Sequence, residues 1–172
     1  MGDKSSIMKT LFLVRHAKSV NHFTAATDFN RGLNERGIKD AGQMAKRLVK
    51  KDILIDRFVS SPALRAKMTA EIFINQYNRK PEEIQFVPDL YHASPEIFDQ
   101  VVSSLDDQFS HVAIFAHNPG ITDYAIYLTG NRLSHMPTCS VFAASASINS
   151  WKDFPSVKKD FIFFETPADG NS

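Results

Sequence analysis

Two histidines and two arginines of this sequence lie where short apolar segments come to an end. Arg15 and His16 end the segment KTLFLVRH, His117 follows the segment HVAIFA, and Arg65 comes shortly after the segment RFVS. Arginine binds phosphate well because its planar guanidinium can donate hydrogen bonds to two oxygens at once. A neutral histidine nitrogen can attack a phosphorus atom. These residue types therefore predict a pocket that binds an oxyanion and transfers a phosphoryl group.

The predicted chemistry is hydrolysis of a phosphate in two steps through a phosphohistidine. His16 attacks phosphorus and displaces the leaving group, and water then releases the phosphate. Arg15, Arg65 and a protonated His117 meet the charge on the three equatorial oxygens. Asn118 is expected to cap the helix that follows it, whose first N–H groups favour an anion. The reaction needs no cofactor and no metal ion.

The elements that must position this pocket alternate between strand and helix patterns. Strands are predicted at residues 9–15, 57–60, 84–87, 111–116, 141–148 and 161–165. Helices are predicted at residues 35–51 and 62–77, from Pro95 with Ser94 as its cap, and from Pro119 to Gly130. Strands that alternate with helices predict a mainly parallel sheet. The carboxyl ends of such strands meet at one edge, which brings the histidines and arginines together.

The whole chain, residues 1–172, is predicted to form one domain. The fold class is α/β, with three layers and a mainly parallel central sheet flanked by helices. A chain of 172 residues with 43% hydrophobic content is long enough to bury a substantial core. The two ends, residues 1–6 and 167–172, are expected to be disordered.

Composition narrows the range of functions and partners. The formal net charge of +1 argues against a general binder of nucleic acids or membrane surfaces. Cys139 is the single cysteine, so no intrachain disulfide can form. The N-terminal segment lacks the apolar run of a signal peptide, and the expected compartment is the cytoplasm. No P-loop or GxGxxG fingerprint is present, which argues against a nucleotide-binding enzyme.

Four segments, in order along the chain, resemble the histidine phosphatase superfamily, whose fold is phosphoglycerate mutase-like. They are LFLVRHAKS at 11–19, then Asp28, Arg31 and LNERG at 33–37, then SSPALRA at 60–66, and finally AHNPG at 116–120 with LTG at 128–130. The short length is most similar to the SixA branch, the phosphohistidine phosphatases. The resemblance implies that His16 is the phosphorylated nucleophile and that Arg15, Arg65 and His117 complete the phosphate pocket. Alanine stands at position 17, where many members have glycine.

The general acid of the larger superfamily members has no clear counterpart in this sequence. It is expected shortly after the third strand, where His92 is the nearest candidate and Asp89 and Glu96 are weaker ones. The SixA branch also tends to lack this acid. A phosphoramidate has a good leaving group once its nitrogen is protonated, so a strong protein acid matters less. The predicted substrate is therefore phosphohistidine in a partner protein, such as a signalling protein.

Six further residues are predicted to contact the substrate around the pocket. They are Lys18, Ser19, Asn21, Arg31, His92 and Asn118. The resemblance puts Arg31 at the border of the pocket, although a structural ion pair with Asp28 explains this arginine equally well.

Three other functions compete with this prediction. The first keeps the histidine chemistry but acts on a small phosphorylated metabolite as a phosphomonoesterase. The second is a non-catalytic module that binds a phosphorylated ligand, and the retained nucleophile argues against it. The third is a metal hydrolase, which needs three or four convergent ligands, whereas the sequence has no HExxH or HxH pair.

Overall fold

One sheet forms the centre of the molecule in the computed structural model, which describes residues 7–25, 27–130 and 132–171. Within these residues its strands are β1 (Met8–Arg15), β2 (Arg57–Ser60), β3 (Gln85–Phe86), β4 (His111–Ala116), β5 (Val141–Ser147) and β6 (Asp160–Glu165). Their order across the sheet is β3-β2-β4-β1-β5-β6. β1 pairs with β4 in parallel, and β5 is antiparallel to both of its neighbours, β1 and β6. The predicted mainly parallel sheet is confirmed.

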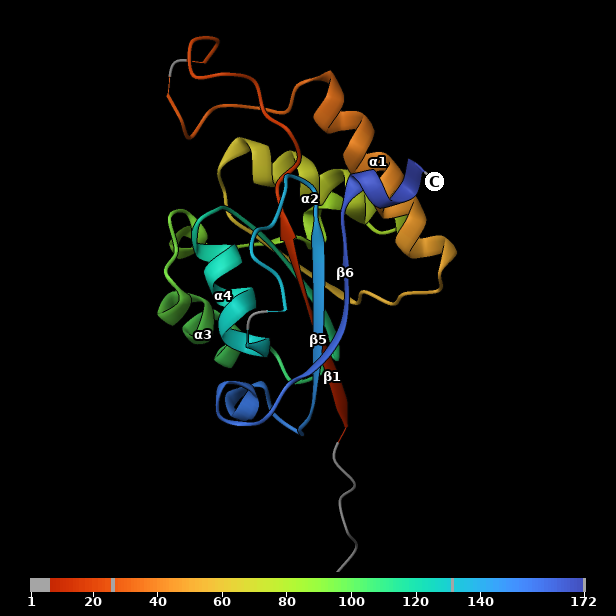
Figure 1. Cartoon of the computed structure of the whole chain (residues 1–172), viewed down its shortest axis with the longest axis vertical. Helices are drawn as coiled ribbons and strands as arrows, with labels where there is room; N and C mark the ends of the chain where they lie inside the picture. The colour runs from red at the N-terminus through yellow and green to blue at the C-terminus, as the bar shows by residue number, and fades with distance from the viewer. Residues whose placement is uncertain (1–6, 26, 131, 172) are drawn as a thin grey trace, which may run out of the picture.

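Helices cover both faces of the sheet and complete three layers (Figure 1). They are α1 (Glu35–Lys50), α2 (Leu64–Gln76), α3 (Pro95–Ser103) and α4 (Gly120–Thr129), with short 3-10 helices at Pro81–Glu83, Pro88–Leu90, Trp151–Ser156 and Pro167–Asn171. Successive side chains of a strand point to opposite faces. Leu11 and Leu13 of β1 therefore join the core under α3 and α4, whereas Phe12 and Val14 join the core under α1 and α2. The predicted three-layer α/β fold is confirmed.

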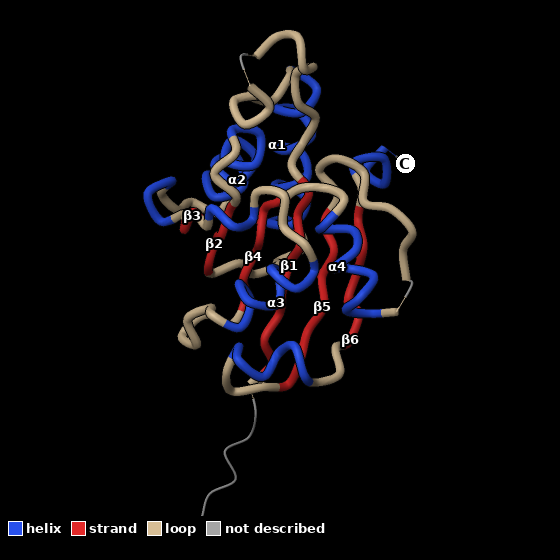
Figure 2. The backbone as a smooth tube through the Cα atoms, turned by 90° about the vertical axis from the view of Figure 1, so that its left-hand side faces the viewer, coloured by secondary structure: helices blue, strands red, loops and turns tan. Residues whose placement is uncertain are grey.

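The strands β1, β2 and β4 end at the same edge of the sheet, where long loops project from it (Figure 2). Pairing aligns Arg15 with Ala116, the last residues of β1 and β4. The alignment continues beyond the strands, because the His16 N–H donates to the Ala116 carbonyl and the Ser61 N–H donates to that of Phe115. Residues that follow the three strands are thus held side by side by backbone hydrogen bonds.

The start of α1 lies directly against the loop that follows β1. Asn34 caps this helix by accepting a hydrogen bond from the Gly37 N–H at 2.8 Å, and its own N–H donates to the Lys18 carbonyl at 3.0 Å. A Cβ on Gly37 would lie 2.0 Å from that carbonyl oxygen. Glycine is therefore needed for α1 to approach the loop this closely, and the approach fixes the chain just beyond the end of β1.

Asn118 does not cap the helix that follows it, contrary to the sequence prediction. α4 has Pro119 in its cap position and no capping side chain. The Asn118 side chain is engaged elsewhere, because it accepts a hydrogen bond from the Thr122 hydroxyl at 2.6 Å and donates to the Met136 carbonyl at 3.1 Å. The predicted end of the helix is correct, since Gly130 has a left-handed φ of 66°.

The C-terminal segment forms a short helix, whereas residues 167–172 were predicted to be disordered. Arg47 of α1 donates hydrogen bonds to the carbonyls of Thr166 and Pro167, and the Thr166 N–H donates to the Asp169 carboxylate. These contacts with a distant helix hold a segment whose own composition suggests no structure. Residues 1–6 and 172 lie outside the described residues.

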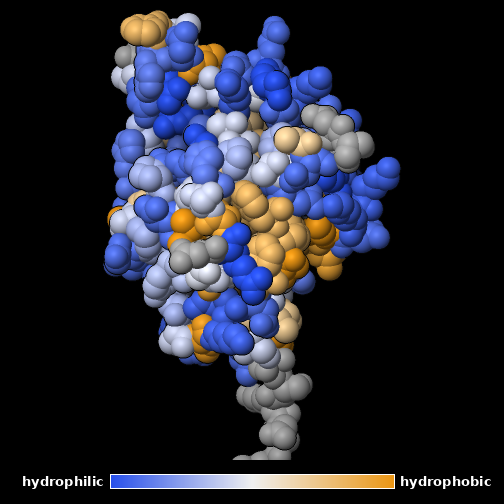
Figure 3. All heavy atoms as spheres, viewed as in Figure 1, coloured by the Kyte–Doolittle hydropathy of each residue, from blue (hydrophilic) through white to orange (hydrophobic). Residues whose placement is uncertain are grey.

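The edge strand β6 presents apolar side chains at the surface (Figure 3). Ile162 is 47% exposed, whereas Phe161 and Phe163 are partly buried against Phe142 and Phe12. The aromatic run of this strand therefore serves mainly to pack the sheet. No helix in the described part of the chain combines the length and the apolar character that crossing a bilayer requires.

Replacing Gly37 with alanine is expected to lower the free energy of unfolding by about 1–3 kcal/mol, because the added methyl overlaps the Lys18 carbonyl. Gly42→Ala in the same helix is the matched control, since a Cβ there meets nothing within 4 Å. The control should raise stability by about 0.4–1 kcal/mol through loss of chain entropy in the unfolded state. Urea unfolding followed by circular dichroism measures both, and similar changes in the two variants would contradict the close approach.

Candidate active site

A pocket of about 320 Å³ opens where β1 and β4 end, and we call it the cationic pocket. It is lined by Arg15, His16, Lys18, Ser19, Arg31, Arg65, His117, Asn118 and Thr138. The four residues predicted to be catalytic are therefore brought together, as are four of the six predicted contact residues. The lining residues include arginine, lysine and histidine but no carboxylate, which suits the pocket to an anion.

His16 is buried and held in one orientation by its own chain. Its Nδ1 lies 2.7 Å from the Ala17 carbonyl oxygen. Because a carbonyl only accepts, Nδ1 must carry the proton, and Nε2 then keeps its lone pair. Burial is the main cause that lowers the pKa of His16 to about 4. The hydrogen bond to Ala17 opposes this shift, and the charges of Arg65 and Arg15 add to it. The ring is therefore a neutral nucleophile at neutral pH.

His117 stands beside His16, with the two ring centroids 5.3 Å apart. Its Nε2 lies 2.8 Å from the Ser61 hydroxyl oxygen, which also accepts a hydrogen bond from the Ala63 N–H. Burial lowers the pKa of His117 to about 3, with smaller contributions from His16 and Arg65. The prediction of a protonated His117 therefore does not hold in the absence of an anion, because burial and neighbouring cations disfavour a further positive charge.

Three buried side-chain nitrogens have no hydrogen-bond partner within the described part of the chain. They are Nε of Arg15, Nε of Arg65 and Nδ1 of His117. The two arginine nitrogens are donors, and Nδ1 of the neutral His117 ring is a donor in the tautomer in which Nε2 accepts a hydrogen bond from the Ser61 hydroxyl. All three belong to residues that line the cationic pocket. Buried donors are almost always paired in folded proteins, since an unpaired one costs about 1–3 kcal/mol. A cluster of such donors is best explained by a ligand with several acceptor oxygens.

Asp28 holds two of the arginines in place, and the sequence predicted only its ion pair with Arg31. Its carboxylate accepts hydrogen bonds from Arg65 at 3.1 Å, from Arg31 at 3.0 Å and from the Tyr91 hydroxyl at 2.6 Å. The hydrogen bond from Tyr91 and the charge of Arg65 hold the pKa of Asp28 well below its usual range. Both accounts of Arg31 are correct, because it pairs with Asp28 and also lines the pocket, where it donates to the Ser19 hydroxyl.

Two predicted contact residues do not line the cationic pocket. Asn21 lies in the exposed loop after β1, where its side chain accepts a hydrogen bond from the Phe23 N–H. His92 is exposed and its ring lies against that of Tyr91, with 3.9 Å between the centroids. Thr138 also lines the pocket, and no motif in the sequence pointed to it, because its place in the pocket depends on how the loop after α4 folds back.

His92 instead lines a second pocket of about 290 Å³, which we call the adjoining pocket. Its lining residues are His92, Ala93, Ser94, Pro95, His117, Asn118, Pro119, Gly120 and Asp123. His117 and Asn118 line both pockets, so the two pockets meet at the end of β4. The first residues of α3 and α4 form the walls of the adjoining pocket.

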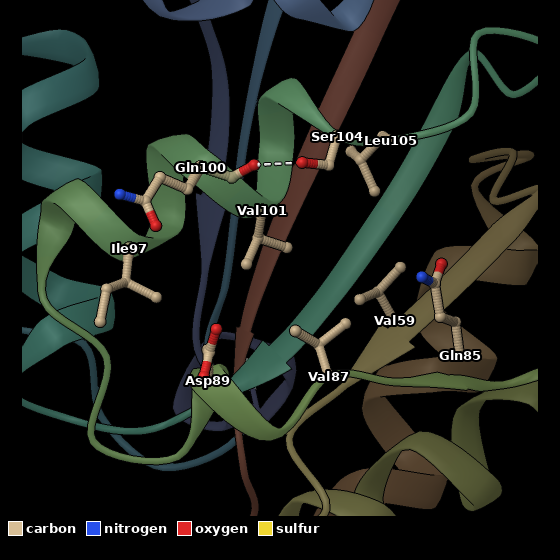
Figure 4. Close-up of a pocket in the computed structure, with 9 residues that line it drawn as sticks. All are labelled: Val59, Gln85, Val87, Asp89, Ile97, Gln100, Val101, Ser104 and Leu105. Atoms are coloured by element: carbon tan, nitrogen blue, oxygen red, sulfur yellow. Dashed lines mark hydrogen bonds between the residues drawn. The ribbon is translucent and has the colours of Figure 1, made fainter.

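A third pocket lies away from this chemistry, between α3 and the strands β2 and β3 (Figure 4). Its walls are mostly aliphatic, and neither histidine nor arginine is among its lining residues. Asp89, a candidate general acid in the sequence, faces this pocket (Figure 4) and not the cationic one. Glu96, the other weak candidate, is exposed and lines neither the cationic nor the adjoining pocket. Among the described residues, no three His, Cys, Asp or Glu side chains are grouped as a metal ion would require.

Sequence comparison relates this chain to a family and to a plant protein. The family described as histidine phosphatase superfamily (branch 1) matches residues 11–94. An uncharacterised chloroplastic protein of Arabidopsis thaliana is 27% identical over 157 residues, which cover 87% of this chain and 72% of that protein.

Solved structures with the same fold include SixA proteins. An Agrobacterium tumefaciens protein, provisionally assigned as the phosphohistidine phosphatase SixA, has a TM-score of 0.77 at 23% identity and covers 92% of this chain and 98% of its own. The protein histidine phosphatase SixA complexed with tungstate has a TM-score of 0.78 at 21% identity and covers 93% of this chain and 98% of its own. The chain therefore has the fold of these structures over nearly its whole length.

The low pKa values of His16 and His117 predict that stability falls as pH is lowered from 6.5 toward 4. In this window the unfolded chain binds protons at histidines whose ordinary pKa is 6.5, whereas the folded chain holds both rings neutral. The loss should be on the order of 1 kcal/mol per histidine by about pH 5.5. Folding also lowers the pKa of Asp28, so this residue acts in the same sense at lower pH, and its stabilisation is lost as the pH falls below the ordinary aspartate range.

Urea unfolding at pH 7 and near pH 5.5 measures this effect. The variant His16→Gln with His117→Gln should lose less stability between the two pH values than the wild type does. An equal loss in both proteins would place the titrating groups elsewhere.

Proposed function

We propose that this chain is a phosphatase of the histidine phosphatase superfamily and that it removes phosphate from phosphohistidine in a partner protein. In this proposal His16 is the nucleophile and carries the phosphoryl group as an intermediate. Arg15, Arg65 and His117 bind the phosphoryl oxygens.

The observation that carries the proposal is the set of unpaired donors on Arg15, Arg65 and His117. Three donors around a buried histidine match the three equatorial oxygens of a phosphoryl group in transfer. The solved SixA in complex with tungstate, another tetrahedral oxyanion, has the same fold and supports an oxyanion as the ligand. Donors that are fixed in advance stabilise the transition state without reorganisation.

The reaction proceeds in two displacements at phosphorus. Nε2 of His16 forms a bond to phosphorus while the bond to the leaving group breaks, and the leaving group keeps the electron pair. Water then bonds to phosphorus as the bond to Nε2 breaks. Inorganic phosphate departs, one proton of the water passes to phosphate or solvent, and His16 regains its neutral form.

The absence of a carboxylic acid from the lining of the cationic pocket favours a phosphoramidate substrate. An alkyl phosphate leaves as an alkoxide, which requires a proton from the protein. A second candidate function, hydrolysis of a small phosphomonoester, would need His92 of the adjoining pocket to supply that proton.

The test compares hydrolysis of a phosphohistidine-bearing protein, p-nitrophenyl phosphate and several sugar phosphates, all in EDTA. We expect a strong preference for phosphohistidine. His16→Ala should abolish turnover of every substrate, whereas His111→Ala, at the opposite end of β4, should retain it. Preference for a sugar phosphate would favour the phosphomonoesterase. Binding without turnover would favour a phospholigand-binding module.

Replacing Arg65 with alanine should lower kcat by about 100- to 1000-fold, the loss expected for a donor that meets developing charge on oxygen. Arg36→Ala is the matched control, because Arg36 lies on the exposed side of α1 and bonds only to Asp40 among the described residues. Steady-state kinetics on p-nitrophenyl phosphate measures both variants. An unchanged rate in Arg65→Ala would remove this guanidinium from phosphate binding.

A further inference from the structure

The adjoining pocket borders the cationic pocket at His117 and Asn118. His16 lines only the cationic pocket, Asp123 lines only the adjoining one, and His117 lines both. In-line displacement places the nucleophile and the leaving group on opposite sides of phosphorus. A phosphoryl group bonded to His16 with one equatorial oxygen on His117 would lie at the boundary of the two pockets, so the adjoining pocket is space next to it for a leaving group directed away from His16.

The carboxylate of Asp123 is available to a ligand in this pocket. Asp123 lies in the first turn of α4 and is exposed. Within the described residues its carboxylate forms no hydrogen bond and no ion pair, unlike those of Asp28 and Asp99, which hold neighbouring side chains. An ionised carboxylate only accepts hydrogen bonds, so the Asp123 side chain offers a free acceptor to a ligand in this pocket.

Contacts between backbone segments form the adjoining pocket in advance of a ligand. A Cβ on Gly120 would lie 1.8 Å from the Ala93 carbonyl oxygen, so α4 starts in direct contact with the loop before α3. Pro95 and Pro119 add apolar surface to the lining. His92, which also lines the pocket, has a left-handed φ of 62°.

We propose that the adjoining pocket receives the imidazole of the substrate phosphohistidine, and that Asp123 accepts a hydrogen bond from the ring nitrogen that carries no phosphate. This inference rests on the proposed function and specifies how the site selects a nitrogen–phosphorus bond.

A carboxylate acceptor activates this leaving group without any protein acid. The hydrogen bond keeps a proton on the distal ring nitrogen, so the phosphorylated imidazole is cationic. When Nε2 of His16 bonds to phosphorus, the substrate nitrogen–phosphorus bond breaks and its electron pair stays on that nitrogen. The ring departs as neutral imidazole with the same proton on its distal nitrogen, and no proton is transferred in the step.

The same contact disfavours phosphate esters. An ester oxygen that becomes an alkoxide needs a donor, and the negative charge of Asp123 would oppose its departure. Selectivity for phosphohistidine therefore follows from the charge of one side chain in the adjoining pocket.

Asp123→Asn tests this inference, because asparagine keeps the shape of the side chain and loses the charge. Wild type and variant are compared on a phosphohistidine peptide and on p-nitrophenyl phosphate, whose nitrophenolate leaves without a proton. On the peptide, kcat/KM should fall by about 10- to 100-fold, as for loss of a hydrogen bond between charged groups. The loss on p-nitrophenyl phosphate should be much smaller, so the ratio of the two values falls.

Glu96→Gln is the matched control, since Glu96 is exposed near the start of α3 and lines neither pocket, and it should keep the wild-type ratio. Three outcomes contradict the proposal. If Asp123→Asn hydrolyses the peptide as fast as wild type, or loses equal activity on both substrates, the role of Asp123 is wrong while the proposed function stands. If wild type hydrolyses p-nitrophenyl phosphate but not the peptide, both the proposed function and this inference are wrong.

Discussion

The hydrogen bond between Nδ1 of His16 and the Ala17 carbonyl is the contact on which the rest of the site depends. It fixes the proton on one ring nitrogen and leaves a lone pair on the other. Burial then keeps the ring neutral over the whole physiological range, with the neighbouring arginines adding to the effect. A protonated His16 has no lone pair on Nε2 with which to attack phosphorus, so the proposed reaction depends on the neutral state of this ring.

Positive charge is concentrated in the pocket and is fixed in place from outside it. Asp28 lies on the loop after β1 and bonds to Arg31, Arg65 and Tyr91. It thereby orients two guanidinium groups and does not itself line the pocket. The carboxylate remains ionised even in acid because Tyr91 and Arg65 hold its pKa low. Because Asp28 holds the arginines from outside the pocket, it orients their guanidinium groups without placing a negative charge beside the anion.

The junction between β4 and α4 serves both pockets. His117 and Asn118 line both the cationic and the adjoining pocket. The Asn118 side chain donates a hydrogen bond to the Met136 carbonyl, which also accepts one from Arg15. Ser61, directly after β2, forms a hydrogen bond with Nε2 of His117 and so orients its ring. Three parallel strands thus contribute to one rigid frame, and the two histidines that we propose for the reaction directly follow strands, where they have little freedom to move.

Local patterns in the sequence determined the order of the elements and the residues at the strand ends. Strand β4 begins and ends at the predicted residues, and Arg15, His16, Arg65 and His117 meet as predicted. Such features depend on apolar periodicity and on the parallel strand arrangement, both of which can be inferred from neighbouring residues. The tertiary structure alone decided which side chains would hold these four. Asp28 and Arg65 are 37 positions apart, and Ser61 and His117 are 56 positions apart. The hydrogen bond from Asn118 to Met136 and the position of His92 outside the cationic pocket could not be predicted either. The partners of a loop side chain depend on which distant segments pack against the loop.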